Sequence, residues 1–245
     1  MFKYKLIIEY EGTNFHGWQK QKKAVSVQDE IEKAFFKLTA KSIIVHGASR
    51  TDSGVHAFEQ TAHVELDKQF NTKTIQEAIN HHLKPRLISI INVTEENDIF
   101  HARFSSVKKQ YLYKILNRLP FSPIEKNLSW HIKQPLDIQF MTTAAQYLIG
   151  THDFSSFRAS GCQANSKIRN IEKISIKKIG DHIDIQILGN AFLYKQVRIM
   201  VGTLVMFGKR KISPIYMKEI LEKKDRRESY ATAPPHGLYL EKLYY

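Results

Sequence analysis

Residues 47–57 read Gly-Ala-Ser-Arg-Thr-Asp-Ser-Gly-Val-His-Ala, and this stretch is the most informative in the chain. The β-branched run Ile43-Ile44-Val45 precedes it, so we expect a strand to end here and a polar turn to begin. Gly54 can adopt backbone angles that are closed to other residues and can therefore hold a sharp bend. The stretch predicts a carboxylate, that of Asp52, on a rigid loop with the guanidinium of Arg50 close by.

These residues allow two interpretations. A nearby guanidinium favours the ionised form of a carboxylate, so Asp52 could be aimed as a nucleophile. The alternative is a turn that an aspartate caps, which is the usual meaning of an isolated Arg-Thr-Asp-Ser-Gly. Arg50 would point to the same side as Asp52 in an extended stretch. It would either contact a ligand or form an ion pair that stabilises the turn.

The charge of the chain indicates a polyanionic partner. Lysine and arginine outnumber aspartate and glutamate by 37 to 24 in 245 residues, a formal charge of +13 that is spread along the sequence. A dispersed basic excess in a folded chain suggests binding to a phosphate backbone, although a generally basic proteome would give the same composition. Composition does not distinguish DNA from RNA.

Several classes of site and location are disfavoured. Cys162 is the only cysteine, which excludes an internal disulfide and a cysteine metal cluster. The pairs His81-His82 and His152-Asp153 lack partners at metal-ligand spacing, so we expect no metal. The first residues lack the apolar core of a signal peptide, and no apolar run is long enough to span a membrane. We therefore expect a soluble, cytoplasmic protein.

The hydrophobic pattern predicts an α+β fold of two similar halves, 1–105 and 106–245, each a split βαβ or ferredoxin-like motif. Ser26 is the expected N-cap of the first helix. The expected strands are 2–10, 42–48, 60–66, 87–93, 109–116, 171–179, 183–188 and 238–243, and the expected helices are 26–38, 73–83, 137–149, 192–207 and 214–222.

The loop 11–23 carries Phe15, His16 and Trp18 among lysines. Aromatic side chains mixed with positive charge suit stacking on unpaired bases beside phosphates. A loop that folds back and buries Trp18 is an equally good interpretation.

The motif Gly-x-x-Arg-Thr-Asp-x-Gly-Val-His-Ala resembles the active-site signature of the tRNA pseudouridine synthase A family. Further stretches match that family in the same order, and Ser53 stands where the family more often has alanine. These stretches are Phe100-His-Ala-Arg-Phe-Ser-Ser106, Tyr111-Leu-Tyr113, Gly150-Thr-His-Asp-Phe-Ser-Ser-Phe157, Gly189-Asn-Ala-Phe-Leu193, Val197-Arg-Ile-Met-Val-Gly202 and Ala233-Pro-Pro-His-Gly-Leu-Tyr-Leu240. The resemblance therefore covers essentially the whole chain.

The resemblance implies two halves that form a continuous antiparallel sheet with a central basic cleft, a homodimer, and tRNA as the partner. The implied activity is conversion of uridine to pseudouridine in the anticodon stem-loop at positions 38 to 40, without a cofactor. Asp52 would be the nucleophile, and Arg50 would help to keep the target base extruded.

Three other residues acquire roles from the same resemblance. Arg198 lies in an apolar helix, where a guanidinium needs an anion or a route to solvent; resemblance makes Asp52 that anion. Tyr111 and Tyr113 alternate on one face of a strand, where core packing is the simpler interpretation, and resemblance selects Tyr111 to stack on the uracil. Leu238 would wall the uridine pocket or merely begin a strand.

Three functions compete to explain these features. A pseudouridine synthase accounts for the signature, the charge and the aromatic residues together. A non-catalytic RNA-binding protein on ferredoxin-like domains leaves Arg198 and the Arg-Thr-Asp loop without a purpose. A metal-dependent nuclease needs clustered carboxylates, and Asp52 is the one strong candidate.

Overall fold

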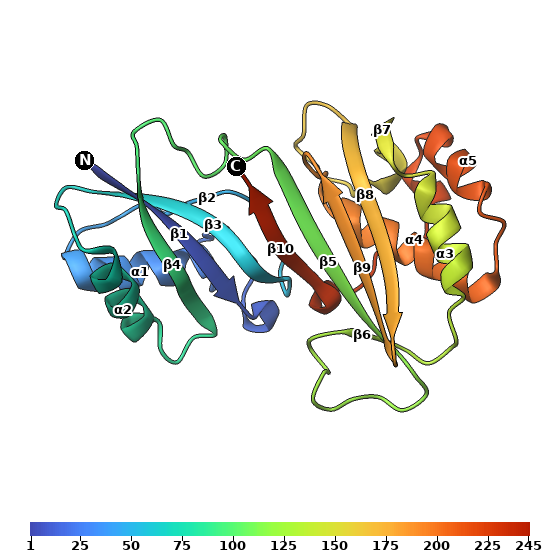
Figure 1. The fold of residues 1–245 in the computed structure, drawn as a ribbon, viewed down its shortest axis with the longest axis horizontal. Coiled ribbons are helices and arrows are strands. Elements are labelled where there is room, and N and C mark those ends of the chain that lie inside the picture. Colours follow the sequence, from blue (N-terminus) through green and yellow to red (C-terminus); the bar gives the residue numbers. More distant parts are fainter. The chain divides into compact units, whose positions relative to one another are not determined.

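The computed structural model describes all residues from 1 to 245 and confirms the mixed α+β class. The chain forms two compact units, which we describe separately (Figure 1). The first unit comprises Met1–Val107 and Tyr239–Tyr245, and the second comprises Lys108–Leu238. The last residues, which the sequence analysis assigned to the second half, thus lie with the first unit. No helix combines the length and the apolar character needed to cross a membrane.

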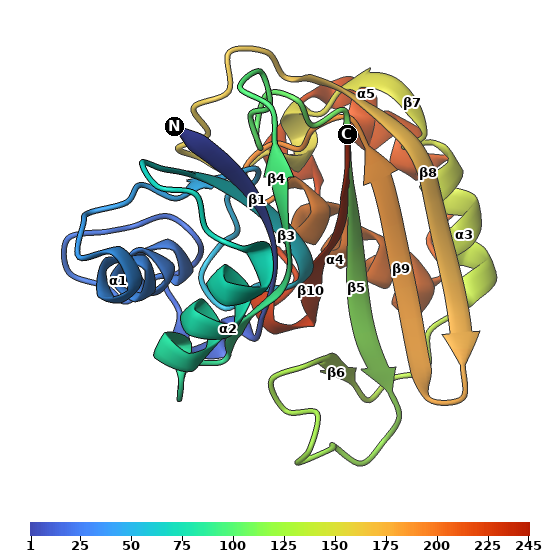
Figure 2. The same ribbon diagram turned by 60° about the vertical axis from the view of Figure 1, so that its left-hand side comes forward.

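The first unit is a mostly antiparallel sheet with two helices on one face (Figure 2). Strand β1 lies between β4 and β3, and β3 also pairs with β2 in antiparallel and with β10 in parallel orientation. The elements are β1 (Phe2–Tyr10), α1 (Val27–Thr39), β2 (His46–Gly47), β3 (His56–Leu66), α2 (Thr72–Leu83), β4 (Ile88–Glu96) and β10 (Leu238–Tyr244).

Local sequence explains the elements that were expected. Alternate residues of β1 are fully buried, as a half-buried strand requires: Tyr4, Leu6 and Ile8. The Ser26 hydroxyl accepts a hydrogen bond from the backbone N–H of Asp29, which confirms the predicted N-cap of α1.

The expected strand at 42–48 is wrong except at its end, where β2 contains only His46–Gly47. Ile44 is exposed, and the backbone of Val45 is bonded by side chains of α1 instead of a neighbouring strand. The Val45 N–H donates to the Glu32 carboxylate at 3.2 Å, and the Gln28 amide donates to the Val45 carbonyl at 3.1 Å. Tertiary hydrogen bonds thus outweigh the strand preference of this β-branched run.

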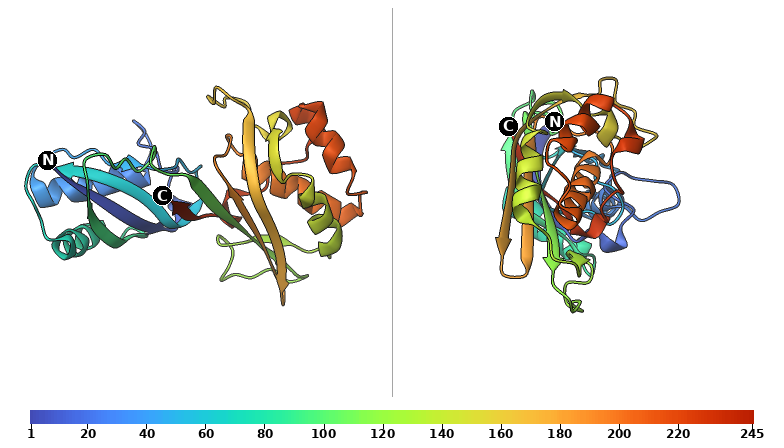
Figure 3. Two further views of the ribbon diagram at one scale, coloured as in Figure 1. Left: turned by 45° about the horizontal axis from the view of Figure 1, so that its top comes forward. Right: turned by 90° about the vertical axis from the view of Figure 1, so that its right-hand side faces the viewer.

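Apart from two short strands, the second unit repeats the order strand, helix, strand, strand, helix, and its longer sheet has the strand order β5-β9-β8-β7 (Figure 3). The short strand β6 pairs with β5. Its elements are β5 (Lys108–Asn117), β6 (Trp130–Ile132), α3 (Ile138–Gln146), β7 (Gly150–Asp153), β8 (Ile168–Ile179), β9 (His182–Gly189), α4 (Gln196–Arg210) and α5 (Tyr216–Lys223). The β9 side chains Ile183, Ile185 and Ile187 are fully buried.

Helices α3 and α4 differ most from their expected bounds in this unit. Helix α4 begins at Gln196 instead of residue 192, because Lys195 adopts a left-handed conformation with φ 59° and the Gln196 side chain accepts the Leu193 N–H. Helix α3 ends at Gln146, and the chain enters β7 at Gly150, whose φ is 110°. Glycine adopts such a φ at little cost.

Candidate active site

The predicted catalytic loop is residues 48–55, which connect β2 to β3 in the first unit. Both of its first residues are bonded to β3: the Ala48 N–H donates to the Thr61 carbonyl at 2.8 Å, and the Gln60 amide donates to the Ser49 carbonyl at 2.7 Å. Asp52, farther along the loop, is half-buried. The loop therefore leaves the sheet in a fixed direction and presents a carboxylate that is partly open to solvent.

The same loop is held on its other side by the segment that follows β1. The Trp18 N–H donates to the Thr51 carbonyl at 3.2 Å, and the hydroxyl groups of Tyr10 and Thr51 are 2.8 Å apart. The Phe15 carbonyl accepts from the Gly54 N–H at 3.3 Å and from the Ser53 hydroxyl at 3.2 Å. Backbone contacts on both sides of Asp52 thus position it.

Gly54 supplies the bend that the sequence predicted. Its φ is 76°, in the left-handed region that favours glycine. The turn that contains Gly54 is closed by the Val55 N–H, which donates to the Asp52 carbonyl at 3.2 Å.

The loop 11–23 folds back, and the stacking interpretation of its aromatic residues is wrong for two of the three. Trp18 is 2% exposed and Phe15 is 3% exposed, whereas His16 is exposed. Trp18 and Phe15 therefore support the 48–55 loop from beneath and have no face available for a base.

His56 at the end of the signature ties three segments together. Its Nδ1 accepts the Gly12 N–H at 3.0 Å, and its ring stacks on that of Tyr239 with centroids 4.7 Å apart. These two contacts give His56 a structural role, because they join the segments of Gly12 and Tyr239 to the end of the loop.

Arg50 is exposed and forms no ion pair or hydrogen bond. The interpretation of Arg50 as half of a turn-stabilising ion pair is therefore wrong. A solvated guanidinium two residues from Asp52 remains available to an anionic ligand.

In the second unit, Tyr111 and Tyr113 point to the same face of β5, as their spacing predicts. Tyr113 is fully buried and its hydroxyl donates to the Pro234 carbonyl at 2.8 Å. Burial raises the pKa of Tyr113 far above its ordinary value, so this group stays neutral. Tyr111 is 7% exposed and meets Phe192 edge to face, with centroids 5.1 Å apart. Core packing thus explains Tyr113 fully.

Arg198, in the first turn of α4, is half-buried and is bonded to the segment before β10. Its Nε donates to the Ala233 carbonyl at 2.8 Å, and the Ala233 N–H donates to the Arg198 carbonyl at 3.0 Å. The snorkelling alternative does not describe this side chain, since its Nε is bonded to a backbone carbonyl. Its pairing with Asp52 stays a prediction.

The same segment brings two more residues to this region of the second unit. Leu238 is 5% exposed, at the start of β10. His236, which the sequence analysis did not single out, is half-buried, and burial followed by the charge of Arg198 lowers its pKa. The Pro-Pro-His-Gly motif before a strand was the available signal for His236.

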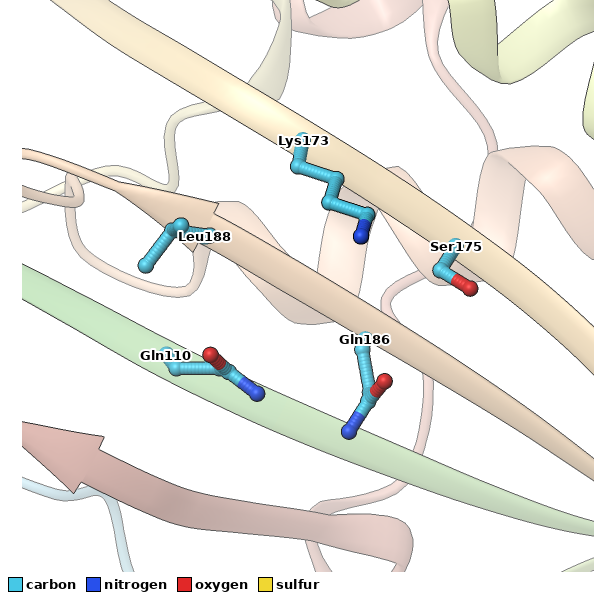
Figure 4. Close-up of a pocket in the computed structure, with 5 residues that line it drawn as sticks. All are labelled: Gln110, Lys173, Ser175, Gln186 and Leu188. Carbon is cyan, nitrogen blue, oxygen red and sulfur yellow. The ribbon is translucent and has the colours of Figure 1, made fainter.

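A shallow pocket on the second unit involves none of the predicted site residues (Figure 4). It has a volume of about 150 Å³ and is lined by Gln110, Lys173, Ser175, Gln186 and Leu188. Gln110 precedes Tyr111 on β5, so the two side chains point to opposite faces of the sheet. The pocket is also smaller than most ligand sites, which occupy roughly 300 Å³ or more.

The candidates therefore divide between the units: Asp52 and Arg50 belong to the first, and Tyr111, Arg198 and Leu238 belong to the second. Within the first unit, Asp52 and Arg50 share one anchored loop. Within the second, Arg198 is joined to the segment that leads to Leu238. No group of residues with metal-ligand chemistry lies in the 48–55 loop.

Comparisons with known proteins agree over almost the whole chain. The family model described as tRNA pseudouridine synthase matches residues 6–105 and 144–245. The tRNA pseudouridine synthase A of Ehrlichia canis is 47% identical over 99% of this chain and 100% of its own length. The corresponding protein of Wolbachia pipientis wMel is 46% identical over the same shares, and that of a Thermoanaerobacter species is 46% identical over 98% of each chain.

Proposed function

The chain belongs to the tRNA pseudouridine synthase family, and from this premise we propose that it converts uridine to pseudouridine in tRNA with Asp52 as the nucleophile. One observation carries the proposal: Asp52 lies in the signature loop, half-buried and with hydrogen bonds to the backbone on both sides of it. A reactive group on a loop with two fixed sides is preorganised for chemistry.

The reaction requires one glycosidic bond to break and another to form. The N1–C1′ bond of uridine is cleaved, the uracil ring turns, and C5 bonds to C1′. C5 then loses its hydrogen as a proton, and N1 ends with a proton. Atoms and electrons balance without an oxidant or a reductant, so the residues need only supply a nucleophile or base, orientation and proton transfer.

Asp52 would begin cleavage either by adding covalently to the nucleotide or by removing a sugar proton. Arg198 would keep the Asp52 carboxylate ionised and oriented, which is the role that an arginine suits because its guanidinium stays charged. Tyr111 would stack on the uracil and offer its hydroxyl for proton transfer. Leu238 would provide an apolar wall for the base.

The target base must leave the helical stack before Asp52 can reach C1′, so the enzyme has to flip it. Arg50 suits this step, since it is exposed, unpaired and two residues from Asp52. We propose uridines at positions 38 to 40 of the anticodon stem-loop as targets, a homodimer as the working form, and the cytoplasm as the location, all by family resemblance.

The non-catalytic RNA-binding alternative is not favoured. A binding protein would need no preorganised carboxylate and would not be expected to match synthases over almost its full length. This chain has both features. The nuclease alternative fails for a similar reason, because Asp52 has no second carboxylate on its loop.

The test is incubation of the purified protein with tRNA that carries tritium at C5 of its uridines, in the presence of a metal chelator. Formation of the new C5–C1′ bond must release that tritium to water. Release with intact RNA supports the proposal, bound but unchanged RNA supports the binding protein, and chelator-sensitive cleavage supports the nuclease. Mapping the modified positions in the product then tests the 38 to 40 assignment.

A further inference from the structure

Three histidines from different parts of the sequence meet in the first unit. His46 on β2 faces His63 on β3 in the strand register, and their rings stack with centroids 4.7 Å apart. His101, after β4, meets His63 edge to face at 4.6 Å. One ring nitrogen from each lies within 4.8 Å of the others. Sequence reasoning missed this cluster, because it searched for histidines close together along the chain.

The cluster is accessible on one side and closed on the other. His63 is 2% exposed, His101 is half-buried and His46 is exposed. A ligand would therefore approach past His46 and His101 and reach His63 at the base.

Hydrogen bonds decide which ring atoms are left for a ligand. The Nδ1 of His63 accepts the Ala102 N–H at 3.2 Å, and the Nδ1 of His101 accepts the Arg103 N–H at 3.1 Å. A neutral imidazole has one donor nitrogen and one acceptor nitrogen, so Nε2 of each ring carries the proton. No hydrogen bond is made by either Nε2. The cluster thus offers N–H donors, whereas a metal ion requires lone pairs.

The spacing also suits an oxygen ligand. A zinc–nitrogen bond is about 2.0–2.1 Å, so one ion can hold two nitrogens no more than about 4.2 Å apart. A hydrogen bond to oxygen spans about 2.7–3.2 Å, so one oxygen can accept from donors that are about 5–6 Å apart. Nitrogens that lie within 4.8 Å of one another fit the second arrangement.

Nearby charges favour an anion as well. The pKa of His101 is lowered by burial first, and then by the positive groups around it, which include His46, Lys3 and Arg103. Lys3 is held in place by the carbonyls of Asp98 and Phe100, and it pairs with Glu65 at 3.2 Å. Lys3 and Arg103 thus bring two positive charges near the cluster against the one negative charge of Glu65, a balance that favours an oxyanion over a dication.

We propose that His46, His63 and His101 form a binding site for one phosphate oxyanion, with the Nε2–H groups of His63 and His101 and the ring N–H of His46 as donors. The chemistry is that of a phosphate oxygen, and two sources can supply it. A backbone phosphate of tRNA is the first, which rests on the proposed function. Free phosphate is the second.

The first experiment titrates the protein with inorganic phosphate and follows the histidine ring C–H resonances by NMR. We expect the resonances of His46, His63 and His101 to move together and to saturate. His81 and His82, which lie on α2 of the same unit, serve as internal controls and should not move. Equal movement of all five would mean an adventitious ion only, and no movement of the cluster would overturn the site. A response to zinc chloride alone would overturn it in favour of a metal.

The second experiment separates the two sources. His46→Ala removes an exposed ring with little risk to folding, and His81→Ala is the matched control on α2. If the ligand is a tRNA phosphate, His46→Ala should raise KM for tRNA about three- to tenfold, the loss typical of one hydrogen bond, with kcat unchanged. If KM is unchanged while phosphate still binds the parent protein, free phosphate is the ligand. Failure of the parent to form pseudouridine would remove only the tRNA source, since the phosphate titration does not depend on activity.

Discussion

The indole of Trp18 lies directly against the backbone of Gly47: a methyl group added to Gly47 would come within 2.2 Å of the indole Nε1. Gly47 ends β2 and opens the signature, and the Trp18 N–H is bonded to Thr51 within it. One buried aromatic residue therefore fixes the loop of Asp52 both at its start and near its centre.

Gly47→Ala should consequently displace either Trp18 or the loop. We expect a loss of stability of about 1–3 kcal/mol, the usual cost of overpacking, together with a clear fall in turnover. Urea unfolding and tritium release measure the two effects. Gly180→Ala is the control, because a methyl there meets nothing within 4 Å and only the φ of 59° opposes it. Equal stability and turnover in Gly47→Ala and the parent would contradict the supporting role of Trp18.

Asp52→Asn should abolish pseudouridine formation and leave tRNA affinity within a few-fold of the parent. The amide is nearly isosteric with the carboxylate but is a far weaker nucleophile and base. Single-turnover tritium release and a filter-binding titration on the same preparation check both halves. Normal turnover by Asp52→Asn would remove the central assignment.

Arg198→Ala should lose more stability and activity than Arg198→Lys. Alanine removes the hydrogen bond from Nε to the Ala233 carbonyl, worth about 1 kcal/mol, as well as the positive charge. Lysine keeps the charge but lacks the forked geometry. If the charge acts on Asp52, the activity of Arg198→Ala should recover in part at alkaline pH, where a carboxylate ionises without assistance.

Arg210→Ala, at the exposed end of the same helix, is the matched control for a lost arginine. It should unfold at nearly the same denaturant concentration as the parent and keep its pH profile. Parental turnover by Arg198→Ala near neutral pH would refute the proposed link to Asp52.

Tyr111→Phe should retain tRNA affinity and lose turnover, because only the hydroxyl is removed while the ring still stacks. Tyr113→Phe should preserve turnover and lose stability instead. The Tyr113 hydroxyl donates to the Pro234 carbonyl, so its removal should lower the free energy of unfolding by about 1 kcal/mol. Kinetics and unfolding of both variants provide the comparison. A fully active Tyr111→Phe would assign that residue to packing alone.

His63 predicts a dependence of stability on pH. Burial, and then the repulsion of His46 and His101, lower its pKa from 6.5 to about 4. Between these two pKa values the unfolded chain binds a proton at His63 that the folded chain does not bind. The contribution of His63 to the free energy of unfolding is therefore fully present above about pH 6.5. It is lost as the pH falls toward 4, by up to about 3 kcal/mol. The NMR titration midpoint of His63 should lie near 4, and a midpoint near 6.5 would contradict this reasoning.

A matched variant separates His63 from the other groups that titrate in acid. His63→Gln keeps a hydrogen-bond acceptor for the Ala102 N–H but cannot take up a proton there. The difference in unfolding free energy between the parent and His63→Gln should thus change between pH 7 and pH 4.5 in favour of the variant.

The regular elements could be predicted because their information is local. Alternation along β1 and the cap at Ser26 depend on neighbours in the sequence, so the period of the side chains was sufficient. The signature around Asp52 was legible for the same reason: its residues are consecutive, and Gly54 marked the bend.

Features that depend on long-range contacts could not be predicted. The run Ile43-Ile44-Val45 has the composition of a strand, and only the side chains of α1 bonded to Val45 decide otherwise. The sequence around Trp18 allows its side chain to face either solvent or the core. In the structure the indole packs against the backbone of Gly47 and is buried.

The histidine cluster shows the same division most clearly. None of the three histidines, His46, His63 and His101, has another member of the cluster close to it in the sequence. The register of β2 on β3 brings His46 and His63 face to face. The sequence by itself determined the family and the fold class and marked the loop of Asp52 as the candidate site, since each is written in consecutive residues or short periods. Tertiary structure alone decided which side chains support that loop and which converge elsewhere, because a strand register joins residues that no local pattern relates.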